Sequence, residues 1–212
     1  MIKRTFEYTA LSAQAQQTAR EEFQRDRDYS YENEVLQEFF EEQLEERGFP
    51  NEYVEYSLSY SQGDGVAFYG RIDVDAEMLQ RLDLPDDERM FLERAVGAGW
   101  TVDFDIERNH WGRHYAHWNT MALEYCGDDI QSMSHDVFAE EIEVGEEMAQ
   151  CEEWMLNAID ELERKLTERV VYTSRELEAK GYEHFDYCDS DEYIAESIEA
   201  NDYVYNEEGK QV

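Results

Sequence analysis

Trp100-Thr101-Val102-Asp103-Phe104-Asp105-Ile106-Glu107-Arg108 alternates apolar and polar side chains from its first residue to Glu107. Successive side chains of a strand point to opposite faces of a sheet, so this period of two predicts a β-strand. The apolar side chains of Trp100, Val102, Phe104 and Ile106 are expected to face a core, and the acids between them to face outward. A sheet with one buried face is therefore expected at the centre of the chain.

Further strand signals lie on both sides of this stretch. Residues 114–125 pair with it across the segment 109–113, and residues 53–60 and 66–74 form a hairpin around Ser61-Gln62-Gly63-Asp64-Gly65. Helical patterns at 75–82 and 85–96 form the crossover to the strand at 100–108. This order predicts an α+β fold with a mainly antiparallel four-stranded sheet, one face of which is covered by helices.

Two helices precede the sheet. Residues 12–23 are good helix formers, and Ser12 suits the N-cap position. Residues 31–47 carry an apolar stripe, which Gly48 and Pro50 bring to an end. We expect both helices to pack on the sheet and to form with it an α+β core domain over residues 1–130.

A long helical pattern runs from about Ser134 to Lys180, and Gly181 is expected to end it. Its apolar residues recur at spacings of three and four: Val144, Met148, Cys151, Met155, Ile159, Leu162, Leu166 and Val170. A stripe of this length needs cover, so we expect it to dock within the chain or in a homodimer. With a short helix at 189–200 and a small strand and turn at 203–209, residues 131–212 are expected to form an acidic helical region. This region packs on the core and is not an independent domain.

The charge of the chain is extreme. The formal net charge is -35 over 212 residues, and residues 114–163 hold fourteen Asp and Glu without one Lys or Arg. Such a surface repels nucleic acid and anionic membranes, which excludes direct binding to either, and it attracts the basic grooves that other proteins use to hold nucleic acid. No apolar stretch is long enough to span a membrane, no secretion signal is visible, and three widely spaced Cys suit a reducing cytoplasm.

The acidic helix is the leading candidate for a partner-binding surface. Ordinary solvated helices mix Lys among their acids, whereas none occurs here before Arg164. The alternative is a solvated face with no partner. The candidate partner-binding residues are Glu140, Glu141, Glu143, Glu146, Glu147, Glu152, Glu153, Asp160, Glu161 and Glu163.

Other motifs carry weaker signals. Asp64, between two glycines, is a secondary candidate for binding a partner or a cation, although the same pattern is typical of a plain hairpin turn. The spacing of His110, His114 and His117 does not match a zinc site, and the acids after Cys188 suit the start of a helix better than a calcium loop. No nucleotide-binding or catalytic motif is present, so we expect neither an enzyme nor a cofactor.

The Ser61–Gly65 motif, with Phe68 and Gly70 after it, resembles uncharacterised accessory proteins of bacteriophages and mobile elements. The tail from Ile198 to Gly209 is similar in character. This resemblance implies a phage or plasmid origin, where acidic DNA-mimic inhibitors of host defence, such as anti-CRISPR and antirestriction proteins, are common.

These observations lead to one principal hypothesis and two alternatives. The principal hypothesis is a non-enzymatic inhibitor in the host cytoplasm that docks its carboxylates into the nucleic-acid groove of a host nuclease or other DNA- or RNA-binding protein. The alternatives are a structural, regulatory or antitoxin-like binding module, and an acidic surface produced by adaptation to high salt. If the helix does not bind, recognition through the sheet or the Gly63–Gly65 turn is the next option.

Overall fold

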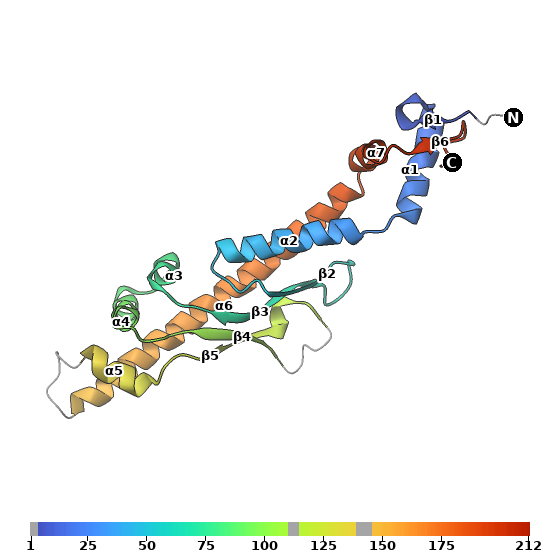
Figure 1. Cartoon of the computed structure of the whole chain (residues 1–212). Helices are drawn as coiled ribbons and strands as arrows, with labels where there is room; N and C mark the ends of the chain where they lie inside the picture. The colour runs from blue at the N-terminus through green and yellow to red at the C-terminus, as the bar shows by residue number, and fades with distance from the viewer. Residues whose placement is uncertain (1–3, 110–114, 139–145) are drawn as a thin grey trace. The chain divides into compact units, whose positions relative to one another are not determined.

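The computed structural model describes residues 4–109, 115–138 and 146–212, and only the backbone at 146–148. The fold is α+β, as predicted, with a four-stranded antiparallel sheet, a small two-stranded sheet and a long helix near the C-terminus. The chain forms two compact units: Phe39–Ala179, and the two chain ends up to Glu38 and from Lys180 (Figure 1). None of the described helices is both long and apolar enough to cross a membrane.

The sheet lies in the unit Phe39–Ala179. Its strands are β2 (Tyr53–Ser57), β3 (Gly65–Ile72), β4 (Phe104–Arg108) and β5 (Met121–Tyr125), hydrogen-bonded in that order. All three pairings are antiparallel, and the register aligns Val54 with Phe68, Ile72 with Phe104, and Phe104 with Tyr125. The helices α3 (Ala76–Arg81) and α4 (Asp86–Gly97) form the predicted crossover between β3 and β4.

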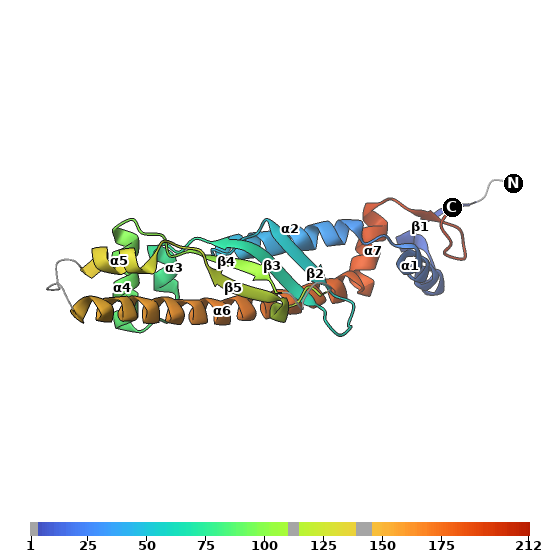
Figure 2. The same cartoon turned by 90° about the horizontal axis from the view of Figure 1, so that it is seen from below.

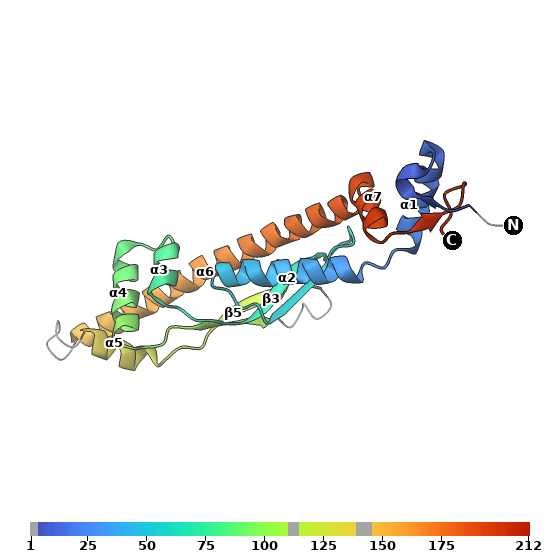
Figure 3. The same cartoon turned by 45° about the horizontal axis from the view of Figure 1, so that its top comes forward.

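One face of this sheet is covered by helices, as expected. α2 (Ser30–Glu46) brings Phe40 against Tyr56 with ring centroids 5.4 Å apart, and Phe49 packs on Phe68 at 5.5 Å. α6 (Glu146–Cys188) lies on the same side of the strands as the second half of α2 (Figure 3), and Figure 2 shows α6 running along the strands. The opposite face, which we call the open face, carries the outward side chains of the strands, among them the exposed acids Glu55, Glu107 and Glu124.

The apolar stripe of α6 is buried within the chain, which confirms that it docks intramolecularly. Its described members are buried: Cys151, Met155, Ile159, Leu162, Leu166 and Val170. Trp154 stacks on Phe91 of α4 at 6.0 Å, and Phe138 of α5 (Ile130–Phe138) meets the same two rings. Val144 lies outside the described residues, as does the side chain of Met148.

The expected end of this helix at Gly181 is wrong. Gly181 is buried inside α6, which continues to Cys188. A helical Gly costs only about 1 kcal/mol relative to Ala. Buried Leu177 and Cys188 on either side extend the packed stripe, so burial outweighs the local preference to stop.

The strand at 100–108 is shorter than predicted, because Asp103 does not face outward. Asp103 is buried, and its Oδ1 accepts a hydrogen bond from the backbone N–H of Val74 at 3.0 Å. β4 therefore begins only at Phe104. The hairpin strand likewise ends at Ser57, and the connection to β3 runs from Leu58 to Asp64.

The chain ends form the other unit, and this division differs from the one expected. β1 (Phe6–Glu7) pairs with β6 (Val204–Tyr205), and α1 (Ala13–Asp26) packs against α7 (Asp191–Ala200). Their shared core contains Tyr8, Leu11, Ala15, Ala19, Ile194, Ile198 and Tyr205. We expected a core domain over residues 1–130, with both N-terminal helices on the sheet, and an acidic helical region over 131–212 that packs on this core. The structure instead groups α1 with the C-terminal segment, because their apolar faces cover each other.

Candidate functional site

The predicted partner-binding acids lie on the first turns of α6 and just before it. Glu140, Glu141 and Glu143 fall outside the described residues, as do the side chains of Glu146 and Glu147. The described side chains are those of Glu152, Glu153, Asp160, Glu161 and Glu163. These five determine what the helix presents to a partner.

The described acids occupy the side of α6 that is not packed. Glu153 and Asp160 are exposed, and seven residues of helix bring them onto one line opposite the buried stripe. Glu152, Glu161 and Glu163 are half-buried at the borders of this surface. We call these five residues the α6 acidic face.

The α6 acidic face is not uniformly negative. Arg164 donates to Glu161 at 2.5 Å and also pairs with Glu168. The hydrogen bond and the charge of Arg164 hold the pKa of Glu161 below its ordinary value. Within the described residues no ion pair involves Glu153, Asp160 or Glu163, so these three carboxylates are the ones open to an external cation.

Two apolar side chains interrupt the carboxylates. Trp154 and Leu156 are both partly exposed beside Glu153, although the pattern of charge alone gives no sign of them. A turn of about 100° per residue places Trp154 and Leu156 on opposite flanks of Glu153 and Asp160, and protein interfaces combine apolar and charged side chains. The α6 acidic face therefore has the composition of a protein-binding surface more than that of a plain line of charge.

The open face of the sheet is a second acidic surface. Glu55, Glu107 and Glu124 are exposed there, and Asp105 stands directly opposite Glu124 in the β4–β5 register. Like charges opposed across a sheet are unfavourable. Arg71 relieves this repulsion only in part, with its Nε 3.5 Å from Asp105.

Asp64 stabilises the hairpin connection from within and is not presented at the surface. It is buried, and its carboxylate accepts hydrogen bonds from the backbone N–H groups of Ser59 and Ser61, at 2.6 and 2.8 Å, and from the hydroxyl of Ser57 at 2.8 Å. Gly63 has φ of +96°, and an added Cβ would lie 2.3 Å from the ring of Tyr115. The structure therefore explains Ser61–Gly65 as a turn organised by Asp64.

The remaining candidate residues also have local roles. His117 Nδ1 lies 2.6 Å from Asn119 Oδ1, while His110 and His114 lie outside the described residues. Ser190 accepts from the backbone N–H of Tyr193 at 3.2 Å and caps α7, as the acids after Cys188 led us to expect. Among the described residues, no group of three His, Cys, Asp or Glu side chains could hold a metal ion.

Sequence reasoning missed a cluster of basic side chains in the unit Phe39–Ala179. Arg47, Arg81, Lys165 and Arg169 line a shallow hollow of about 470 Å³. Three of these side chains pair with acids of the same unit: Arg47 with Glu176, Arg81 with Glu77 and Lys165 with Asp83. Arg169 donates to the backbone carbonyl of Arg81 at 3.1 Å. These basic side chains are therefore engaged in contacts within their own unit.

The chain matches no protein-family model, and comparison with curated proteins and with solved structures gives no match.

Proposed function

We propose that this chain is a non-enzymatic inhibitor that binds the nucleic-acid groove of a basic protein, such as a host defence nuclease. It acts in the cytoplasm, and it does not bind nucleic acid directly. The observation that carries the proposal is the run of fourteen acids without a Lys or Arg over residues 114–163. α6, whose other side is buried, presents the described acids of its first half to solvent.

The mechanism is substitution of carboxylates for phosphates. Glu153, Asp160 and Glu163 would meet the Lys and Arg side chains that normally hold the nucleic-acid backbone. One exposed ion pair contributes only about 0.2–1 kcal/mol, so no single acid decides the affinity. Several acids together still raise the association rate and exclude the competing nucleic acid.

Trp154 and Leu156 are partly exposed, so this surface offers apolar contacts as well as charge. Aromatic residues near the centre of an interface often contribute most of the binding energy. Because they lie beside Glu153, they favour a protein as the binding partner over small cations in solution.

The test begins with capture of partners from a bacterial lysate on the immobilised full chain at about 50 mM salt. A captured protein must be displaced by a DNA or RNA duplex and by about 500 mM salt. The key variant neutralises the described face: Glu152→Gln, Glu153→Gln, Asp160→Asn and Glu163→Gln. We expect it to weaken binding to the captured protein about tenfold or more, because several ion pairs are lost together.

A charge-matched control separates this surface from general acidity. Glu34, Glu38, Glu42 and Glu45 are exposed acids of α2, and changing all four to Gln removes the same charge. This control should change the affinity by less than about threefold. Equal losses in both variants would point to unspecific attraction, and binding that is indifferent to nucleic acid would exclude groove occupancy.

A further inference from the structure

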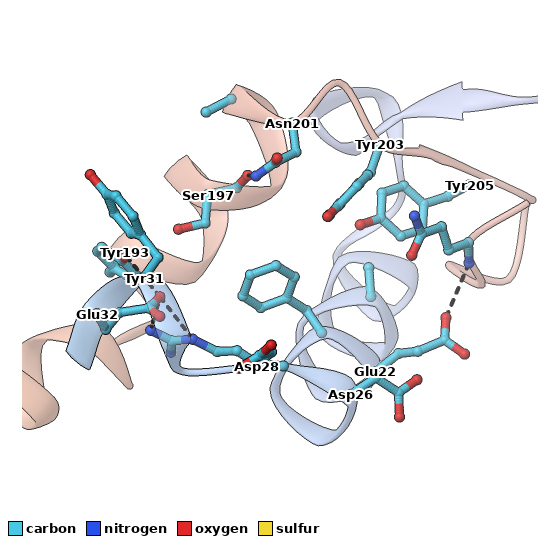
Figure 4. A pocket seen from close by; sticks show the side chains of 15 residues that line it. Glu22, Asp26, Asp28, Tyr31, Glu32, Tyr193, Ser197, Asn201, Tyr203 and Tyr205 are labelled. Atoms are coloured by element: carbon cyan, nitrogen blue, oxygen red, sulfur yellow. Dashed lines mark hydrogen bonds and ion pairs between the residues drawn. The ribbon is translucent and has the colours of Figure 1, made fainter. Parts of the chain in front are cut away.

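A cavity of about 630 Å³ lies within the unit formed by the chain ends. Its walls come from the end of α1, the start of α2, helix α7 and the C-terminal segment (Figure 4). It is independent of the α6 acidic face, which belongs to the other unit.

The wall of this cavity is negative. Four acids line it: Glu22, Asp26, Asp28 and Glu32. Arg27 is the single basic residue among the lining residues, and its guanidinium is bound to Glu32 at 2.6 Å. Outside the lining, Arg25 pairs with Asp26 at 2.8 Å and with Glu22 at 3.5 Å, so four acids face two guanidinium groups and the wall keeps a net negative charge.

Aromatic side chains complete the wall. Phe23, Tyr31, Tyr193 and Tyr203 line the cavity, and Tyr31 is 68% exposed. The labelled Tyr193 and Tyr203 stand on opposite sides of the pocket in Figure 4. The faces of aromatic rings attract cations, most strongly where carboxylates add to the field.

One buried acceptor in this lining has no donor. Glu32 is 7% exposed, and its Oε1 accepts from Arg27 and from the hydroxyl of Tyr193 at 3.0 Å. Its Oε2 is buried and has no hydrogen-bond partner among the residues that the structure describes. A buried acceptor without a donor is unfavourable, so a ligand that brings an N–H group would satisfy it.

Arg27 shows what ligand such a wall accepts. Its guanidinium lies 4.4 Å from the ring centroid of Tyr29 and 5.1 Å from that of Tyr193, while Glu32 binds its N–H groups. The planar guanidinium combines stacking with several directed hydrogen bonds, which an ammonium group cannot do. The same combination of rings and carboxylates continues along the cavity beyond Arg27.

We propose that this cavity binds an arginine side chain of a partner protein. The guanidinium would enter between Tyr31 and Tyr203 and donate to Oε2 of Glu32, and the negative charge of Glu22 and Asp26 would favour its entry. This inference goes beyond the proposed function, because it names a single-residue pocket in a different unit. It stands whether or not the α6 acidic face occupies a nucleic-acid groove.

The test is an NMR titration of the full chain with acetyl-Gly-Arg-Gly-amide. We expect shifts confined to residues 19–32 and 193–211, and no shift with the citrulline peptide, which keeps the shape but lacks the charge. Equally tight binding of the lysine peptide, or tighter binding of spermidine, would overturn the assignment to arginine.

Paired variants locate the site. Glu22→Gln with Asp26→Asn should weaken the arginine peptide about tenfold, and Tyr31→Ala should weaken it severalfold at a position exposed enough to leave the fold intact. Glu196→Gln with Glu199→Gln removes the same charge from exposed positions of α7 outside the cavity and should change the affinity by less than about twofold. Equal effects of the two pairs would overturn the assignment of arginine binding to this cavity.

Neutralising the α6 acidic face should leave peptide binding unchanged, so a failure of this inference is distinct from a failure of the proposed function.

Discussion

Arg27 joins segments that are far apart in the sequence. Its side chain is 2% exposed, and its guanidinium binds Glu32 and the backbone carbonyl of Cys188 at 2.7 Å. Tyr29 and Tyr193 flank the same group. A buried charge is tolerated only where ion pairs and hydrogen bonds offset its desolvation, and here both are present.

Replacing Arg27 with Met should therefore destabilise the chain strongly. It leaves Glu32 buried without its cation, and we expect a loss of about 3–5 kcal/mol in the free energy of unfolding. Arg25→Met is the matched control, because Arg25 is 65% exposed and pairs only with neighbouring acids, and it should cost less than about 1 kcal/mol. Urea unfolding followed by circular dichroism measures both, and similar losses would contradict the role of Arg27.

The same pair makes stability depend on pH. Burial opposes ionisation of Glu32, but hydrogen bonds from Arg27 and Tyr193 and the charge of Arg27 outweigh it and lower the pKa of Glu32. A carboxyl group with a pKa lower in the folded than in the unfolded chain stabilises the fold above its unfolded value of about 4.3. This stabilisation is lost as the pH falls through the lower, folded pKa.

Comparison with Glu32→Gln isolates this effect. The difference in urea midpoint between wild type and variant should be constant from about pH 7 to 5 and should shrink as the pH falls below about 4. A difference that grows in acid would mean that the carboxyl group is neutral in the folded state.

At the scale of the element, α6 is held by one side only. Met155 is fully buried, whereas the next residue, Leu156, is 41% exposed. Met155→Ala should lower the free energy of unfolding by about 2–5 kcal/mol, because it removes buried atoms and leaves a cavity. Leu156→Ala should lower it by less than about 1 kcal/mol. Comparable melting temperatures for the two variants would show that the stripe is not the packed side.

Local patterns predicted the elements well where burial agreed with them. The Ser12 cap, the end of α2 at Gly48 and the stripe of α6 each follow from side chains a few residues apart, and the structure contains all three. The predictions for Gly181 and Asp103 were wrong because burial there opposes the local pattern. Tertiary contacts keep Gly181 inside a helix and turn Asp103 inward, and no local pattern contains that information.

The candidate site divides in the same way. Counting charges led to the α6 acidic face, but only the structure shows that Arg164 engages Glu161 and that Trp154 is partly exposed beside Glu153. The cavity at the chain ends was beyond prediction, because its walls are about 170 residues apart and no motif marks either side.

At the scale of the whole molecule, repulsion among like charges is the main electrostatic term. A net charge of -35 destabilises a compact chain more than an expanded one, and the ion pairs within the described residues are mostly exposed and weak. Added salt screens this repulsion, since the Debye length falls from roughly 14 Å at 50 mM to about 4 Å at 500 mM. Stability should therefore rise over this range.

The urea midpoint measures this rise. It should increase equally in sodium chloride and in tetramethylammonium chloride, because screening depends on ionic strength and not on the cation. The variant with Gln at 34, 38, 42 and 45 carries four fewer charges and should show a smaller increase. A midpoint that is flat or falls with salt would mean that the acids are too far apart in the fold to repel one another.

The same titration separates the proposed inhibitor from adaptation to high salt. Screening is nearly complete when the Debye length is shorter than the distance between neighbouring charges, so the gain should level off between about 0.5 and 1 M. An acidic surface adapted to high salt would instead keep gaining stability into the molar range, and would gain more from sodium than from tetramethylammonium if it binds cations. A plateau below about 1 M that is the same for both cations would leave a basic partner as the remaining reason for the charge.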